Sequence, residues 1–211
     1  MIIQRERNFK MSKTETYPVI TISREYAAGG RSVARLLSEK TGLEWYDKDF
    51  VKDLAKESGY SEEDILAEGE ELKNSAKILD SILNSMVSYT SSHDAIYQAQ
   101  KEEVVKLSAS PCIIVGRCAN VILEEAGIPH FDVFLYADMD HRLAHAKDLA
   151  ENGDEDLQKY VQTRDAYRAN YYKHYTKKVL GDYHDYDLHI NTGLFGYEQA
   201  VEMILDAISR K

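Results

Sequence analysis

Apolar residues along the chain follow two alternating patterns. Short runs rich in valine, isoleucine and aromatic residues are typical of buried strands, and segments whose apolar positions recur every three or four residues are typical of helices. The predicted strands lie at residues 19–22, 43–46, 111–117, 131–136 and 187–192. The predicted helices lie at residues 31–41, 119–126, 157–179 and 197–209, with another beginning after Asp138. This alternation predicts an α/β fold, with a parallel sheet of about five strands in one domain.

Two stretches fall outside this alternation. Residues 1–16 are polar and predict a flexible N-terminal tail, so that the folded domain is expected over residues 17–211. Residues 70–107 are almost free of glycine and proline and have helical spacing, which predicts one or two long helices. This helical stretch has no chemistry of its own that the sequence reveals, and its default interpretation is packing or contact with a partner.

The charge balance limits the classes of partner. The chain has 211 residues and a net charge of −10, which argues against a general nucleic-acid or anionic membrane surface. It has two cysteines, Cys112 and Cys118, and its N-terminus lacks the apolar core of a secretory signal. We therefore expect reduced thiols, a cytoplasmic location and no membrane partner.

The segment from Val19 to Ser32 has the layout of a phosphate-binding loop. A strand pattern runs into a glycine pair, and a helix pattern begins directly after it, so backbone N–H groups and the helix dipole point at one small volume. The match to G-x-x-x-x-G-K-[ST] is partial: Gly30 and Ser32 fit, Arg31 takes the lysine position, and Glu25 takes the first glycine position. An ordinary tight turn between a strand and a helix is the alternative.

Arginines gather around this loop and in the second half of the chain, and none lies between Leu36 and Gly116. Guanidinium groups are favoured where phosphate oxygens need paired donors. Arg117 follows a predicted central strand, at the sheet edge where ligands bind in parallel folds. Arg164 and Arg168 lie one turn apart in a stripe of tyrosines, and a tyrosine stripe is usually a packing face. With ten arginines in the chain, such a gap also arises often by chance.

Four landmarks, in this order, carry a resemblance over residues 18–210: Ile22-Ser23-Arg24-Glu25-Tyr26 with Gly29-Gly30-Arg31, then Tyr46-Asp47-Lys48, Ile114-Val115-Gly116-Arg117, and Tyr186-Asp187-Leu188 with Ile190-Asn191-Thr192. With them the chain resembles the cytidylate kinase-like family of P-loop kinases. The resemblance implies a three-layer P-loop kinase fold, with a helical acceptor-binding region at about 47–107 and a helical lid at about 142–168.

The resemblance also implies roles for individual residues. The cofactors would be ATP and Mg²⁺, with the metal near Ser32. ATP would be bound by Arg24, Ala28, Gly29, Gly30, Arg31, Ser32, Asn191 and Thr192. The acceptor would be bound by Asp47, Arg117 and Asp165, and the catalytic cations would be Arg31, Arg142, Arg164 and Arg168.

Three positions depart from the family pattern. Ala27 and Ala28 replace two glycines of the loop, and an alanine is strained wherever φ is positive. His145 stands where similar lids carry a further arginine. The leading expectation is transfer of phosphate from ATP to a pyrimidine monophosphate such as CMP or dCMP. A nucleotide-binding regulator with little turnover, a kinase of another small phosphate acceptor, and self-association as a homodimer stay open.

Overall fold

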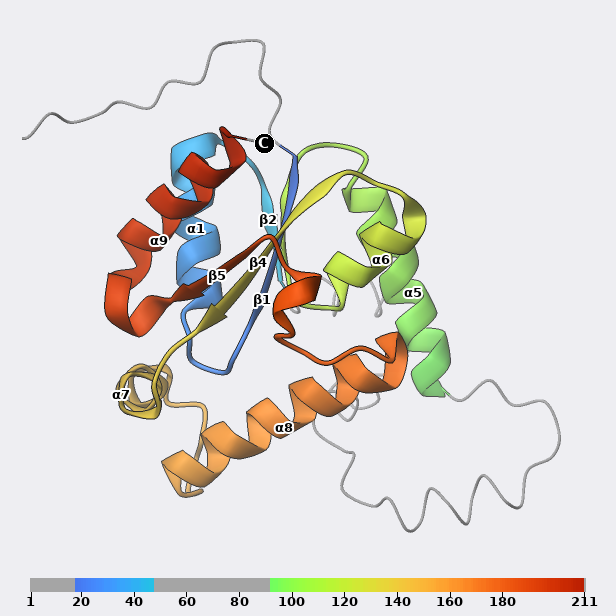
Figure 1. Ribbon diagram of the computed structural model, residues 1–211. Helices are drawn as coiled ribbons and strands as arrows, with labels where there is room; N and C mark the ends of the chain where they lie inside the picture. The colour runs from blue at the N-terminus through green and yellow to red at the C-terminus, as the bar shows by residue number, and fades with distance from the viewer. Residues whose placement is uncertain (1–17, 48–91, 211) are drawn as a thin grey trace, which may run out of the picture.

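The computed structural model describes residues 18–47 and 92–210, and this part forms an α/β fold around one parallel sheet (Figure 1). The strands are β1 (Val19–Arg24), β2 (Trp45–Tyr46), β3 (Ile113–Val115), β4 (His130–Tyr136) and β5 (Leu188–Asn191), in the order β2-β3-β1-β4-β5. The helices are α1 (Gly30–Thr41), α5 (Ser92–Leu107), α6 (Ala119–Ala126), α7 (Met139–Leu149), α8 (Leu157–Thr176) and α9 (Thr192–Ile208), with a short 3₁₀ turn η1 (Tyr183–Asp185). The predicted α/β class and the five parallel strands are confirmed.

The sheet is buried on both faces because side chains alternate along its strands. Ile20 and Ile22 of β1 face the core beneath α1 and α9, where Trp45 also packs. Val19 and Ile114 belong to a second core, beneath α5 and α6. Figure 1 shows these two helix pairs on opposite faces of the sheet.

The ends of the helices follow from local chemistry. Gly42 ends α1 in the left-handed conformation, as its position in the sequence predicts. Asp138 and Asp156 cap α7 and α8, because each carboxylate accepts a backbone N–H of the first turn. The helix predicted to begin at residue 197 begins at Thr192 instead. Asn191 caps that first turn, and the helix kinks at Gly196, where φ is +75°.

Helix α8 lies across the lower side of the molecule, beneath the connection between β1 and α1 (Figure 1). Its first half packs against that connection through Tyr160 and Val161. Its second half packs on the other core, where Tyr172 accepts a hydrogen bond from Asn120 at 2.9 Å. The helix is therefore held at both ends.

Several expectations lie outside the described residues. Residues 1–17, 48–91 and 211 are not described, and these include the predicted tail and most of the helical region at 47–107. Within residues 18–47 and 92–210, no helix combines the length and the apolar character needed to cross a bilayer.

Candidate functional site

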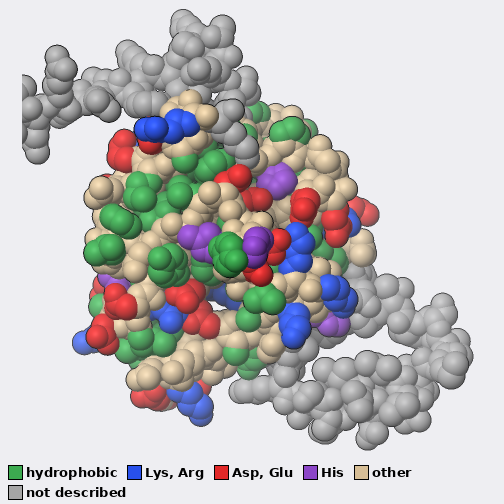
Figure 2. Space-filling view, in the orientation of Figure 1, with side chains coloured by type: hydrophobic (Ala, Val, Ile, Leu, Met, Phe, Trp, Pro, Cys, Tyr) green, Lys and Arg blue, Asp and Glu red, His purple; other side chains and the backbone are tan. Residues whose placement is uncertain are grey.

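A pocket of about 260 Å³ lies at the carboxyl end of the sheet, between the β1–α1 loop, the end of β3 and helix α8. In the space-filling view the surface is hollowed between the sheet and α8 (Figure 2). This is the edge at which ligands bind in open parallel sheets, because connections to helices on opposite faces diverge there.

The loop at the start of α1 brings bare backbone to the pocket. Gly29 has φ +82°, and a Cβ at this position would lie 2.1 Å from the ring of Tyr197. Within the described residues, no side chain caps the helix that follows. The first N–H groups of a helix have no partner within it, and they lie at the positive end of its dipole. Gly30, Arg31 and Ser32 all line the pocket, so this loop offers an anion several backbone donors.

Positive side chains outnumber negative ones around the pocket. Among the described residues its lining holds two carboxylates, Glu25 and Glu151. It also holds five arginines, which come from the β1–α1 loop, the end of β3 and α8: Arg24, Arg31, Arg117, Arg164 and Arg168. The whole chain has a net charge of −10, so this concentration of cations is a local feature.

Two of these guanidinium groups, those of Arg24 and Arg168, are buried with too few negative charges and hydrogen-bond acceptors around them, within the described structure, to offset the loss of water. Burial, and then repulsion from Arg168, lowers the pKa of Arg24. Burial also lowers the pKa of Arg168, whose Nη1 is withdrawn from solvent without a hydrogen-bond partner in the described part of the chain. Its guanidinium lies 5.2 Å from the ring centre of Tyr26. A bound anion would relieve both the repulsion and the missing hydrogen bonds.

The turn after β3 holds Arg117 in an unusual conformation. Gly116, Arg117 and Cys118 have φ values of +80°, +61° and +55°, three left-handed residues in succession. Left-handed backbone is costly for residues with a side chain, and such outliers gather at functional sites. The turn directs the chain into α6 and leaves Arg117 on the pocket wall.

Asp47 lies beneath the arginines. Its carboxylate accepts a hydrogen bond from Nε of Arg31 and is 3.8 Å from Nη2 of Arg24. The side chain of Asp47 is only 7% exposed and is absent from the pocket lining. Its position therefore suits a counter-ion that orients both guanidinium groups.

Helices α7 and α8 and the connection between them, the segment for which a lid is expected, contact the first half of the loop. The backbone N–H of Tyr26 donates to Asp165 Oδ1 at 2.6 Å, and its hydroxyl donates to Glu151 Oε2 at 2.7 Å. His145 Nδ1 is 2.8 Å from the carbonyl oxygen of Ala27. Because a carbonyl only accepts, this nitrogen carries the proton. Residues 25–27 thus both line the pocket and bond to α7, α8 and their connection.

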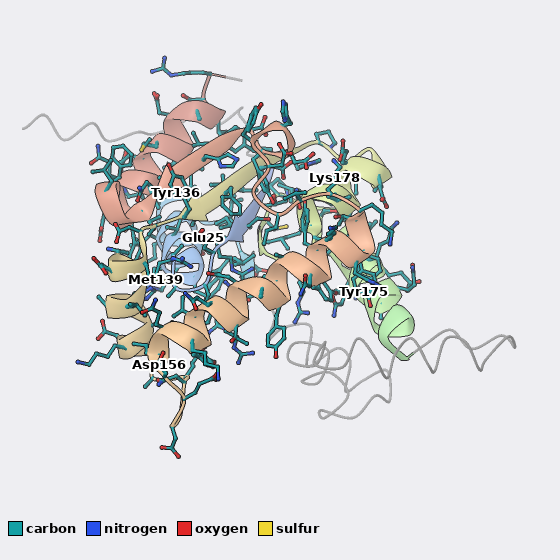
Figure 3. The ribbon with its side chains drawn as sticks, turned by 60° about the horizontal axis from the view of Figure 1, so that its bottom comes forward. Glu25, Tyr136, Met139, Asp156, Tyr175 and Lys178 are labelled. Carbon is teal, nitrogen blue, oxygen red and sulfur yellow. The ribbon has the colours of Figure 1, made fainter. Side chains whose placement is uncertain are left out.

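Arg142 is part of this lid contact. Its side chain is 8% exposed; Nη1 donates to Asp165, and Nε lies 3.4 Å from Glu25. Figure 3 shows Glu25 between the end of the sheet and the two lid helices, whose beginnings are marked by Met139 and Asp156. In this structure Arg142 joins the lid to the loop and does not line the pocket.

The structure brings together many of the residues that the sequence analysis singled out. Those that line the pocket are Arg24, Gly29, Gly30, Arg31, Ser32, Arg117, Arg164 and Arg168. Those that do not are Ala28, Asp47, Arg142, Asp165, Asn191 and Thr192. Thr192 is fully buried, and its hydroxyl donates to the carbonyls of Ala28 and Tyr136, at 2.9 and 3.2 Å, so it connects the loop to the end of β4.

Sequence reasoning missed Glu151 and Tyr26 as parts of the site. Glu151 lies in the exposed connection between α7 and α8, and it also lines the pocket, 3.9 Å from Arg31. No local signal marks it, because its contacts come from residues more than a hundred positions away. Tyr26 lies inside the loop motif. The only sequence signal for it was that a tyrosine cannot serve as a glycine does in such a loop.

The two alanines of the loop differ in conformation. Ala27 has φ +60°, so the expected strain applies to it. Ala28 is fully buried and does not adopt a positive φ.

The sequence model of the cytidylate kinase-like family matches residues 19–194, which is most of the chain. The chain belongs to this family. It is 26% identical over 196 residues to a cytidylate kinase of Archaeoglobus fulgidus, covering 91% of this chain and 95% of the relative.

Solved structures show the same kinase fold. An uncharacterised protein of Eubacterium ventriosum has a TM-score of 0.69 at 21% identity, covering 92% of this chain and 99% of the other. A shikimate kinase of Acinetobacter baumannii, in complex with shikimate, has a TM-score of 0.53 at 15% identity, covering 93% and 95%. Identities this low show the fold alone. The fold and the family thus place the chain among the P-loop kinases.

Proposed function

We propose that this chain is an ATP-dependent phosphotransferase that converts ATP and CMP or dCMP into ADP and CDP or dCDP. The observation that carries the proposal is the convergence of five arginines on a glycine loop at one pocket. Phosphoryl transfer asks a protein mainly for alignment of donor and acceptor and for cations against the developing charge. The described residues supply both.

The residues fit the phosphates of a nucleotide. Gly29 lines the pocket without a side chain, no side-chain cap of α1 is present in the described part of the chain, and among the described residues Arg168 Nη1 is buried without a hydrogen-bond partner. Arg31 and the N–H groups of residues 29–32 would hold the donor phosphates, with the Ser32 hydroxyl available to Mg²⁺. Mg²⁺ would neutralise charge on the donor phosphates. Asn191 would lie near the adenine, whereas Thr192, which is fully buried, would act only by holding the loop through the carbonyl of Ala28.

Arg117, Arg164 and Arg168 would hold the acceptor phosphate and the transferring group, since they line the pocket from the end of β3 and from α8. Helix α8 would also help to exclude water, which otherwise competes as acceptor. For Arg142 and Asp165 we propose a positioning role, because their side chains hold the lid to the loop. Asp47 would act through Arg24 and Arg31.

A coupled ADP-release assay across nucleoside monophosphates tests the proposal. Turnover with CMP or dCMP is expected, and Arg31→Ala should lower kcat/KM by at least a hundredfold. Arg35→Ala is the matched control, because Arg35 lies one turn further along α1 and pairs with Glu39 at the surface. Turnover only with a different small acceptor would keep the phosphotransferase and replace the substrate.

A regulator of the same fold is the second candidate function. Glu151 lies in the pocket near Arg31, and Arg142 is engaged with two carboxylates. Both features would slow turnover. Tight ATP binding, with no ADP release on any acceptor, would support the regulator over the enzyme. We also propose a cytoplasmic location, since Cys112 and Cys118 are free, buried thiols.

A further inference from the structure

The side chain of Arg24 runs between the glycine loop and the turn after β3. Arg24 is the last residue of β1, and its side chain passes beneath the glycine loop towards the end of β3. A Cβ at Gly30 would lie 3.1 Å from its Cγ and Cδ, and a Cβ at Gly116 would lie 2.1 Å from its Nη1. Glycine at both positions therefore leaves the space that this side chain occupies.

The guanidinium of Arg24 has much unused donor capacity. Its one ion pair in the described structure is with Asp47, at 3.8 Å from Nη2, and Asp47 is shared with Arg31. The side chain is 15% exposed and lines the pocket together with Arg168, Arg117 and Arg31, whose positive charges add to the effect of burial and lower the pKa of Arg24 further. A guanidinium has five N–H donors in a planar fork, so one distant carboxylate leaves most of them for a ligand.

The Arg24 side chain reaches residues on both sides of the pocket. A Cβ at Gly116, beside Arg117, would lie 2.1 Å from its Nη1 and 3.6 Å from its Nη2, and Nη2 is also 3.8 Å from Asp47, the carboxylate that Arg31 shares. Under the proposed function, the side of Gly116 and Arg117 holds the acceptor phosphate, and the side of Asp47 and Arg31 holds the donor phosphates.

We propose that Arg24 is a catalytic residue that binds oxygens of the acceptor phosphate and of the transferring phosphoryl group at the same time. This inference rests on the proposed function. In the reaction the bond from the γ-phosphorus to the bridging β-oxygen breaks, and a bond to an acceptor phosphate oxygen forms. The acceptor oxygen is already ionised, so no proton has to be removed. A cation shared by both groups offsets their mutual repulsion and aligns them.

The competing role for Arg24 is structural: it would only hold Asp47 in place. The two roles differ in what Arg24→Gln does to ligands that differ by one phosphate. A bridging residue contacts the γ-phosphate and the acceptor phosphate, which ADP and cytidine lack. A structural residue affects both members of each pair alike, where the pairs are ADP with AMP-PNP and cytidine with CMP.

The test measures dissociation constants by calorimetry for ADP, the non-hydrolysable analogue AMP-PNP, cytidine and CMP, each with Mg²⁺. For Arg24→Gln we expect AMP-PNP to weaken at least fivefold and CMP at least tenfold, with ADP and cytidine within twofold of the wild type. Arg24→Lys keeps the charge and the neighbour Asp47 but lacks the fork, and the same selective losses are expected. This second variant covers the case in which Arg24→Gln does not fold.

Gly116→Ala tests the geometry without changing any charge. Its Cβ would displace Nη1 of Arg24, so CMP binding should fall at least tenfold. Gly42→Ala is the matched control, because Gly42 also has a positive φ, +76°, but nothing lies within 4 Å of its Cβ position. The control therefore has a similar backbone cost and should bind all four ligands as the wild type does.

Equal changes within each ligand pair, or no changes, would overturn the bridging role. A loss confined to one pair would overturn it too, because Arg24 would then serve a single anion. A wild-type chain that binds none of the four ligands would overturn the proposed function itself, which separates that failure from this one.

Discussion

At the scale of single residues, the neighbouring alanines of the loop show how one backbone angle changes the effect of a substitution. Ala27 has φ +60° and is 7% exposed, whereas Ala28 is fully buried without a positive φ. A left-handed alanine costs about 1–2 kcal/mol. Replacing it by glycine removes that cost. The replacement also loses about 0.8 kcal/mol from burial of the methyl group, and about 0.4–1 kcal/mol because glycine gives the unfolded chain more conformational entropy.

We therefore expect Ala27→Gly to change the free energy of unfolding by less than about 0.5 kcal/mol, because these effects nearly cancel. Ala28→Gly relieves no strain and should destabilise the protein by about 1–2 kcal/mol. Urea denaturation of the two variants beside the wild type measures the difference. Equal losses in both variants would contradict the assigned left-handed conformation of Ala27.

At the scale of elements, the connection between α7 and α8 places a carboxylate among the arginines. Glu151 accepts a hydrogen bond from the Tyr26 hydroxyl and lies 3.9 Å from Arg31. A phosphate arriving at the same guanidinium meets a like charge. Under the proposed function, this connection would oppose the binding of the donor nucleotide.

Glu151→Gln should bind Mg²⁺-ATP about two- to fivefold more tightly, which is the scale of a partly exposed charge interaction. Glutamine still accepts from Tyr26, so the lid contact is kept. Glu155→Gln is the control, because it removes the same charge from an exposed position in the same connection. Calorimetry at low salt compares the three proteins, and equal affinities for wild type and Glu151→Gln would reject the opposing role.

Helix α8 also depends on a buried hydrogen bond in its second half. Asn120 Nδ2 donates to the Tyr172 hydroxyl at 2.9 Å, and both residues are 3% exposed. Tyr172→Phe leaves that donor without a partner, so we expect a loss of about 1–3 kcal/mol in unfolding free energy. The double variant Asn120→Leu, Tyr172→Phe should recover part of this loss, since neither polar group remains. Additive losses in the double variant would show that the hydrogen bond carries no coupling energy.

At the scale of the whole molecule, stability depends on side-chain contacts at the start of β4, at the end of the sheet opposite the pocket. His130 Nε2 lies 3.0 Å from Asp132, and His130 Nδ1 lies 2.6 Å from the carbonyl of Ile128. The bond to Asp132 raises the pKa of His130 above its usual value, against the effect of burial; the Ile128 carbonyl and the charge of Asp187 act in the same direction as Asp132.

A raised pKa in the folded state means that protonated His130 stabilises the fold. This contribution is complete below the unfolded pKa, near 6.5, and is lost as the pH rises through the folded pKa. The stability difference between wild type and His130→Asn should therefore be larger at pH 6 than at pH 9, as measured by denaturant unfolding. Asp132→Asn should reduce the same pH dependence, because Asp132 makes the largest contribution to the raised pKa. A difference that stays constant over this range would rule out the linkage.

Much of this fold could be predicted from the sequence because its signals are local. The apolar run at β3 and the helix at α6, closed by Gly127, depend on neighbours along the chain. The first turn of α9 could not be found in this way. It contains Gly193 and Gly196, which disfavour a helix, and the Asn191 cap and the burial of Thr192 against the loop hold it in place.

The site residues also divide into those whose positions could be predicted from the sequence and those whose positions could not. Arg31 and Arg117 follow strands, and parallel strands bring their carboxyl ends together, so their convergence was predictable from topology. The position of Arg142 was not, because it depends on Glu25 and Asp165, which lie far from it in the sequence. Its charge suggested a phosphate ligand, and its neighbours make it a link between lid and loop.

The short edge strand β2 has a practical consequence. It contains Trp45, the only tryptophan of the chain, half-buried in the core two residues before Asp47. Indole emission therefore comes from a single known place, close to the counter-ion of Arg24 and Arg31, and selective excitation separates it from the 15 tyrosines. The protein carries its own optical probe, so titrations and stopped-flow traces can follow events at the arginine cluster without any attached dye.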